Sequence, residues 1–260
     1  MKFVDSHAHI NSEEFQDDRD QVIARAFQED ILAILCPVEL TEPNNLRIAL
    51  ELIEKHDNIF AAAGVHPHNA QDFHSGLAST LKRLTSEKKI LAVGEIGLDF
   101  HYNLSSPEEQ RKVFRNQLNL AQDLDLPVVI HSRNAADEIA AAIEEESFSN
   151  GGVLHCFTEN WEFAEHMLEH NFLISFSGIL TYPNAQSLRD VAKKLPLAKT
   201  LIETDSPYLT PVPYRGRIKR NEPVYVKEVA KTLADIQHVD LEEVAQVTSQ
   251  NFASLFPIEI

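Results

Sequence analysis

The chain has 260 residues, of which 43% are hydrophobic and 24% are charged, proportions typical of one large soluble α/β domain. Its 40 acidic and 23 basic side chains give a formal net charge of −17, which argues against a protein that coats nucleic acid, because such binding depends on many cations. No apolar stretch approaches the roughly 20 residues that cross a bilayer, the first residues lack a secretory signal, and two cysteines favour a reducing cytoplasm over a disulfide framework.

Short β-branched, apolar runs alternate with longer stretches of helical period, and no linker divides the chain. The runs expected as strands are 2–4, 31–35, 59–63, 90–93, 127–130, 153–154, 172–176 and 200–202. The stretches expected as helices are 19–29, 43–56, 76–88, 107–124, 135–146, 161–170, 184–194, 223–236 and 240–255. Pro107 and Pro223 are each expected in the first turn of a helix, where proline is tolerated.

Eight strands that alternate with helices form either an open doubly wound sheet or a closed barrel. A doubly wound dinucleotide-binding protein needs a glycine-rich loop after its first strand, but this chain has no glycine before Gly64. The pattern therefore predicts an α/β protein whose single domain, residues 1–260, is a distorted (β/α)8 TIM barrel. Such barrels carry their sites at the C-terminal rim of the strands.

Six side chains that can bind metal follow five of these strands. They are His7, His9, Glu95, His131, His155 and Asp205. His7 and His9 are two residues apart in an extended segment, so both imidazoles can face one ion. Taken singly, a strand-end histidine is more often structural, and Asp205 could be a helix cap. Their convergence on one rim instead predicts a pair of divalent ions, which in such sites lie roughly 3.5–4 Å apart.

Seven motifs in chain order complete this pattern. They are DSHAH at 5–9, GVHPH at 64–68, GEIGLD at 94–99, IHSR at 130–133, LHCF at 154–157, ETDSP at 203–207 and RGRIKRNEP at 215–223. The series resembles the TatD-type deoxyribonuclease family, which belongs to the amidohydrolase-like, metal-dependent hydrolases. The resemblance covers essentially the whole chain.

The resemblance implies a role for each of the six residues. His7 and His9, completed by Asp205, would hold one ion, and His131 and His155 would hold the second. Glu95 would bridge the two ions. The ligand types suit zinc, nickel or manganese, and phosphodiester chemistry often uses magnesium or manganese. Asp205 can also accept a proton from water as a general base, so Asp205 and Glu95 are the expected catalytic residues.

Further residues on the rim are expected to contact substrate. They are His66, Arg133, Arg215, Arg217, Lys219 and Arg220. The four cations follow the eighth strand, where barrels often bind phosphate, although they could form a solvated loop. His66 could instead be a structural or ligand-orienting residue, and Arg133 could pair with a surface acid.

Three other residues near these motifs have expected roles outside direct catalysis. Asp99 is expected either to orient a ligating imidazole or to cap the following loop. Cys156 is expected to face away from the site as a buried, inert thiol, and Cys36 is expected to be inert too.

These expectations favour a metal-dependent phosphodiesterase that acts on DNA from accessible or single-stranded ends, because a rim pocket does not easily admit an intact duplex. The alternative enzyme is a hydrolase of a small phosphoester, amide or lactone that uses the same ions. A non-catalytic metal-binding protein is a third hypothesis, which the open, water-activating type of site disfavours. DNA is the expected partner, with no membrane and no stable protein partner.

Overall fold

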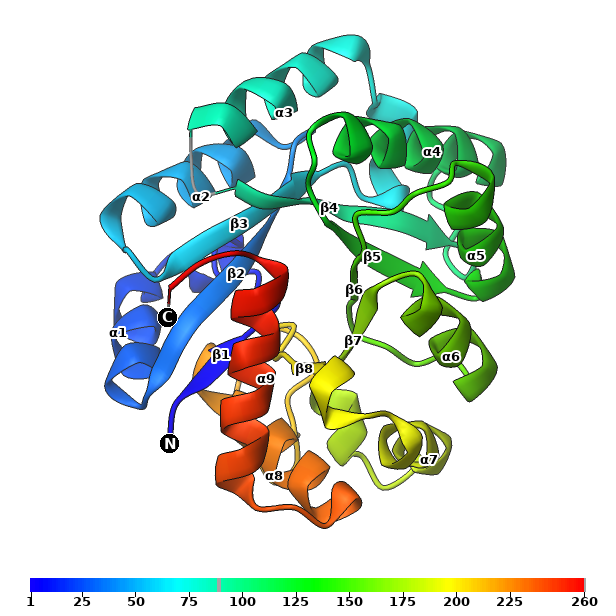
Figure 1. The fold of residues 1–260 in the computed structure, drawn as a ribbon. Coiled ribbons are helices and arrows are strands. Elements are labelled where there is room, and N and C mark those ends of the chain that lie inside the picture. The colour runs from blue at the N-terminus through cyan, green and yellow to red at the C-terminus, as the bar shows by residue number, and fades with distance from the viewer. Residues whose placement is uncertain (88–89, 260) are drawn as a thin grey trace.

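The protein, described here by a computed structural model over residues 1–87 and 90–259, is built around eight parallel strands in chain order (Figure 1). The strands are β1 (Phe3–Asp5), β2 (Ile31–Glu39), β3 (Ile59–Gly64), β4 (Ile90–Asp99), β5 (Val128–Arg133), β6 (Gly152–Leu154), β7 (Phe172–Phe176) and β8 (Thr200–Ile202). Backbone hydrogen bonds from Ser6 to Ile202 (3.1 Å) and from Asp205 to His7 (2.9 Å) join the first and last strand segments. These bonds close the sheet, and the predicted single-domain TIM-barrel fold is confirmed.

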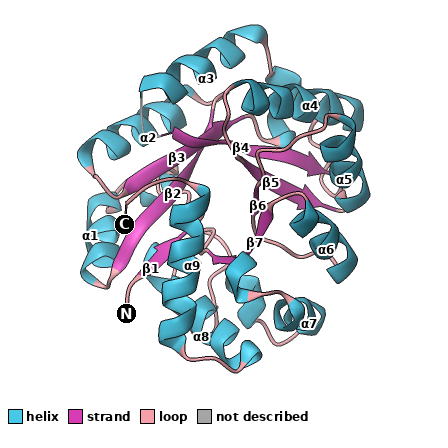
Figure 2. Cartoon of the chain, viewed as in Figure 1, coloured by secondary structure: helices cyan, strands magenta, loops and turns pink. Residues whose placement is uncertain are grey.

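Helices surround the strands (Figure 2). They are α1 (Arg19–Gln28), α2 (Pro43–Lys55), α3 (Ser75–Glu87), α4 (Pro107–Asp123), α5 (Ala136–Glu145), α6 (Trp161–Glu169), α7 (Gln186–Lys194), α8 (Val226–Gln237) and α9 (Leu241–Leu255). Within the described ranges, no helix is long and apolar enough to cross a membrane.

Two prolines were predicted to begin helices, and the structure confirms one of these predictions and contradicts the other. Pro107 begins α4 as expected, behind a capping box in which Ser106 and Glu109 exchange hydrogen bonds. Pro223 begins a short 3₁₀ turn, η5 (Pro223–Tyr225), and α8 starts only at Val226. That prediction was wrong by three residues. The predicted end of the third helix, residue 88, lies outside the described residues.

Alternate residues of the strands contribute to two cores, because successive side chains of a strand point to opposite faces. One core fills the barrel and takes side chains from every strand and from α9. Its buried members are Val4, Ala33, Leu35, Phe60, Ala62, Ala92, Val129, Val153, Leu173, Leu201, Phe252 and Phe256. We call this set the interior core. The larger outer core packs the other face of the sheet against the helices.

Strand β4 is longer than predicted and contains an irregularity that matters for the site. The register between β4 and β5 shifts between Gly94 and Ile96, so Glu95 is an extra residue in the strand. Ala92 lies in the interior core before the shift, whereas Ile96 lies in the outer core after it. Glu95 and Asp99 therefore face the barrel interior. The expectation that Glu95 follows the strand was wrong, because pairing with β5 continues through the glycines to Asp99.

Candidate metal centre

Glu95 lies at the centre of a group of histidines at the C-terminal rim of the barrel. Its Oε1 atom is 2.8 Å from His155 Nε2 and 3.0 Å from His131 Nδ1. His66, which follows β3, brings its Nε2 atom to 3.3 Å from the same oxygen. Only 7% of Glu95 is exposed, so this carboxylate is surrounded by imidazoles rather than by solvent.

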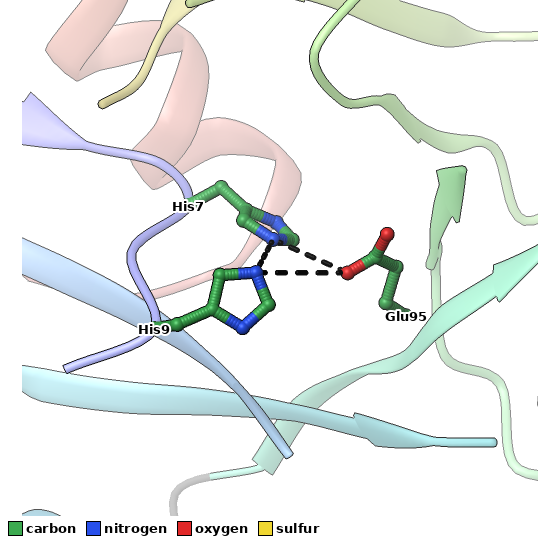
Figure 3. Close-up of side chains that lie close together, drawn as sticks. All are labelled: His7, His9 and Glu95. Carbon is green, nitrogen blue, oxygen red and sulfur yellow. Dashed lines mark hydrogen bonds and ion pairs between the residues drawn. The ribbon is translucent and has the colours of Figure 1, made fainter. Parts of the chain in front are cut away.

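His7 and His9 approach Glu95 from the segment after β1 (Figure 3). The Nε2 atoms of the two histidines lie 3.3 Å apart, and Glu95 Oε2 is 3.4 Å from the Nε2 of His7 and 4.0 Å from that of His9. Asp205 completes this side, with its Oδ1 atom 3.3 Å from His9 Nε2 and 3.9 Å from His7 Nε2. The intervening Ala8 packs in the outer core, which leaves the imidazoles on either side of it facing the interior.

The six predicted metal ligands therefore lie in one cluster. Within this cluster there are three sets of residues whose donor atoms lie within 4.8 Å of the other donors of the same set. The sets are His7, His9 and Glu95; His7, His155 and Asp205; and His66, Glu95 and His131. Imidazole nitrogens that converge on shared carboxylates are the donor set of zinc and similar divalent ions. The residues present thus fit a metal centre. His66, predicted to contact substrate, lies in a group that can hold an ion.

The electrostatics of the cluster also favour a cation. Burial raises the pKa of Glu95, but the charge of His155 and the other imidazoles outweighs this effect and holds the pKa well below its ordinary value. Burial likewise raises the pKa of Asp205, but the hydrogen bond with His9 and the charges of the neighbouring imidazoles together outweigh it, so that the pKa is lowered. Burial lowers the pKa of His66 to about 4 despite the nearby Glu95. Despite burial, Glu95 raises the pKa of His155 well above its ordinary value, so an ion bound at that imidazole would displace a proton.

Asp99 performs both of the roles left open for it. Its Oδ2 atom accepts hydrogen bonds from His131 Nε2 at 3.1 Å and from His68 Nε2 at 2.9 Å. Its Oδ1 atom accepts the backbone N–H groups of His101 at 3.0 Å and Tyr102 at 2.9 Å. One carboxylate therefore orients an imidazole of the cluster and fixes the loop between β4 and α4.

Two supporting carboxylates had not been predicted. Glu203 is fully buried, and its Oε1 atom lies 3.3 Å from His155 Nδ1 and accepts the backbone N–H of Cys156 at 2.7 Å. Glu39 accepts the backbone N–H of His66 at 2.8 Å. The acid two residues before a strand-end ligand was a usable signal for Glu203. No signal in the sequence pointed to Glu39, because β2 was expected to end four residues earlier, at residue 35.

Neither thiol has the properties of a reactive or metal-bound cysteine. Cys36 is buried in the outer core, and burial raises its pKa to about 12. Cys156 is only partly buried; it has a φ of +44° and places Sγ 3.3 Å from Ser177 Oγ. The expectation of a buried Cys156 was wrong, because β6 ends at Leu154 and strand alternation does not extend to it. Burial of its thiol still raises its pKa well above the ordinary value.

The four predicted cations after β8 differ in how they are held. Arg220 donates from Nη2 to both carboxylate oxygens of Asp18, at 2.6 and 2.7 Å, so its guanidinium fastens the loop to the chain before α1. The other three, Arg215, Arg217 and Lys219, are exposed.

Three of the predicted arginines lie over aromatic rings, and one of them, Arg220 over Phe15, is already paired with Asp18. The Cζ atom of Arg133 is 4.6 Å from the ring centre of Tyr102, and that of Arg215 is 3.9 Å from the ring centre of Tyr182. Such cation–π contacts hold a guanidinium in place without neutralising its charge. Arg133 and Arg215 therefore keep a charge for an anionic ligand.

Comparison with known proteins identifies the family. The family described as TatD related DNase matches residues 4–257. An uncharacterized metal-dependent hydrolase, YabD of Bacillus subtilis, is 42% identical over 255 residues, which are 98% of each chain. The 3′-5′ ssDNA/RNA exonuclease TatD of Erwinia amylovora is 36% identical over 259 residues, covering 97% of this chain and 98% of that protein.

A solved structure agrees with both sequence comparisons. The crystal structure of YjjV, a TatD homolog from Escherichia coli, matches with a TM-score of 0.91 at 32% identity, covering 99% of this chain and 98% of that one. The resemblance seen in the motifs is thereby confirmed. The chain belongs to the TatD related DNase family of metal-dependent hydrolases.

Proposed function

We propose that the chain is a divalent-metal-dependent phosphodiesterase, a deoxyribonuclease that acts on accessible or single-stranded DNA ends. The observation that carries this proposal is the cluster of five imidazoles around Glu95, with Asp205 beside it. Support also comes from the relative named as a single-strand DNA and RNA exonuclease. A site of this kind needs little covalent chemistry from the protein, which mainly positions the substrate.

The residues that would hold the ions divide into two sides that share Glu95. His7, His9 and Asp205 form one side, and His131 and His155 form the other, with His66 close to the latter. Two divalent ions, of zinc, manganese, magnesium or nickel, would supply Lewis acidity that activates water near neutral pH and offsets the charge of the phosphoryl group.

Asp205 is the residue placed to move a proton. Its Oδ1 atom lies 3.3 Å from His9 Nε2, and despite burial the neighbouring imidazoles together lower the pKa of this carboxylate. An ionised carboxylate beside the reacting water can accept its proton as a general base. Glu203 and Asp99 keep the imidazoles of His155 and His131 in fixed orientations, so the nitrogens that face Glu95 are presented without rearrangement.

Phosphate recognition would come from charge concentrated next to the rim. We assign it to Arg215, Arg217 and Lys219 of the loop after β8, and to Arg133 at the end of β5. Arg220 would keep this loop in place through its ion pair with Asp18. A few cations close to the site can bind a strand that the rest of an acidic protein repels, because screening limits the repulsion to about 10 Å.

The burial of the site favours a strand end as substrate. Glu95 and His155 are only 7% and 6% exposed, so a scissile phosphate must reach into the rim. Duplex DNA is stiff, with a persistence length of roughly 150 base pairs. An intact duplex therefore cannot bend into such a site, whereas a single strand can. An unpaired end is therefore the expected substrate.

The test is a metal screen with substrates of different classes. The purified chain would be stripped with a chelator, reloaded with Zn²⁺, Mn²⁺, Mg²⁺ or Ni²⁺, and given single-stranded DNA, blunt duplex and RNA, each labelled at one end or the other. We expect progressive shortening of the single strand, slower attack on the duplex, and turnover of methyl 4-nitrophenyl phosphate. Hydrolysis of lactones or carboxylic esters without cleavage of any phosphodiester would overturn the proposal.

A further inference from the structure

Exposed aromatic and large apolar side chains gather at the rim of the barrel. Among the described residues, the strongly exposed ones are Met1, Tyr102, Leu104, Tyr208 and Val212. All but Met1 lie in two loops, the one between β4 and α4 and the one between β8 and α8. Single exposed apolar side chains need no explanation, but their concentration around a site marks a binding surface.

The two tyrosines contact different parts of the candidate metal centre. The ring of Tyr208 contacts His9, with centroids 5.9 Å apart. The ring of Tyr102 contacts His68 at 5.6 Å, and His68 in turn lies 6.2 Å from His131. His9 and His131 approach Glu95 from different strands, so we expect a ligand that touches both tyrosines to extend across that cluster.

Each tyrosine is fixed at its base, and about half of it is exposed. Tyr102 is 54% exposed and Tyr208 is 51% exposed. The backbone N–H of Tyr102 is held by Asp99 at 2.9 Å, and the Arg133 guanidinium lies over its ring. The backbone N–H of Tyr208 is held by the carbonyl of Asp205 at 2.9 Å. Rings held by residues of the site itself require little ordering when they bind a flat ligand.

We propose that Tyr102 and Tyr208 are stacking platforms for nucleobases on the two sides of the scissile phosphodiester. This inference rests on the proposed phosphodiesterase function and names the part of the substrate that the rim recognises. An aromatic ring stacks on any base, so it binds single-stranded nucleic acid with little sequence preference. A paired base has both faces covered by its neighbours, which gives the site a preference for unpaired strands.

The charge of the protein makes such contacts necessary. Nucleic-acid affinity normally depends on many phosphate contacts, but this chain has a net charge of −17 and exposes only a few cations at its rim. Stacking supplies affinity that does not depend on charge. A small ester or lactone spans only the metal centre and gains nothing from rings beside two different parts of it, so the arrangement favours a polynucleotide.

The test replaces the rings and the bases separately. Tyr102→Leu and Tyr208→Leu would be assayed on a dT decamer, and on decamers with a single abasic residue moved through the terminal positions. We expect KM for the dT decamer to rise roughly 5- to 150-fold in each Leu variant, with metal content unchanged. Tyr102→Phe and Tyr208→Phe, which keep the ring, should restore KM. Gln250→Ala, exposed on α9 and outside the rim loops, should leave KM unchanged.

The abasic series shows whether base and ring act as a pair. At one position, loss of the base should raise KM for the wild-type chain but not further for Tyr102→Leu, because the two changes remove the same interaction. Leu variants with wild-type KM, or an equal loss in Gln250→Ala, would overturn the inference while cleavage of the decamer sustains the phosphodiesterase. Failure to cleave any decamer or methyl 4-nitrophenyl phosphate would reject the proposed function itself.

Discussion

The interior of the barrel has two halves, a lower one filled by the apolar interior core and an upper one, at the C-terminal rim, filled by the polar cluster around Glu95. The same strands build both halves. On β5, Val129 lies in the interior core, and His131, two residues later, faces Glu95. On β6 and the residues that follow it, Val153 and His155 repeat this order. A strand thus supplies stability at its beginning and chemistry at its end, from the same face of the sheet.

The two halves stabilise their buried side chains in different ways. In the lower half, apolar side chains leave water without needing partners, and Phe252 of α9 completes the packing. In the upper half, buried carboxylates and imidazoles are stable only because they pair with one another, as Glu203 does with His155. Changes at the rim should therefore affect activity more than folding, and changes in the interior core should do the reverse.

The largest expected effect is on turnover, at the rim. Asp205→Asn keeps an oxygen ligand but loses the atom that accepts a proton, so kcat should fall roughly 10²- to 10⁴-fold. Metal content, measured by elemental analysis, should change far less than kcat, and the unfolding midpoint should stay close to that of the wild type. A variant that keeps wild-type kcat on a DNA strand would reduce Asp205 to a ligand or a cap.

The next effect is on stability, in the interior core. Phe252→Ala removes a fully buried ring and should lower the free energy of unfolding by about 3–5 kcal/mol, measured by urea denaturation. The folded fraction should keep wild-type kcat, because the change lies at the opposite end of the barrel from the site. Gln250→Ala, exposed on the same helix, is the matched control and should change stability by less than about 0.5 kcal/mol. Equal losses in both variants would contradict the division between the two halves.

A smaller effect is expected at a residue that holds an imidazole of the candidate metal centre. Asp99→Asn retains an oxygen for the backbone N–H groups of His101 and Tyr102 but holds the His131 imidazole less strongly. Metal affinity, measured by calorimetry, should fall roughly 10- to 100-fold, with little change in the unfolding midpoint. Unaltered affinity together with a large loss of stability would make Asp99 part of the scaffold rather than of the metal centre.

The smallest effect concerns the loop after β8. Arg217→Ala/Lys219→Ala should weaken single-strand binding about equally for every sequence and flatten the slope of log K against log salt by roughly 0.7 for each phosphate that the loop no longer binds. Lys193→Ala/Lys194→Ala, in the last turn of α7, makes the same change in net charge away from the rim and should leave the slope as it is. Equal slopes in the two variants would mean that only net charge matters.

Much of the architecture was predictable because it is local. Short apolar runs alternating with helical periods predicted all eight strands, and the position of the six predicted metal ligands at or just beyond the ends of those runs predicted that they would lie close together. No long-range information was needed, because in a parallel barrel the ends of all strands lie at one rim. For the same reason the family could be named from seven short motifs.

Other features were decided only by contacts between distant segments. The facing of Glu95 depends on the register of β4 against β5, which shifts within a glycine-containing run that reads as a loop. The position of His66 next to Glu95 and the ion pair of Arg220 with Asp18 join residues that are 29 and 202 positions apart. The direction of a side chain at the end of a strand is set by its neighbours' hydrogen bonds rather than by its own sequence, so alternation failed at Cys156 and at Glu95, where the regular pairing is interrupted.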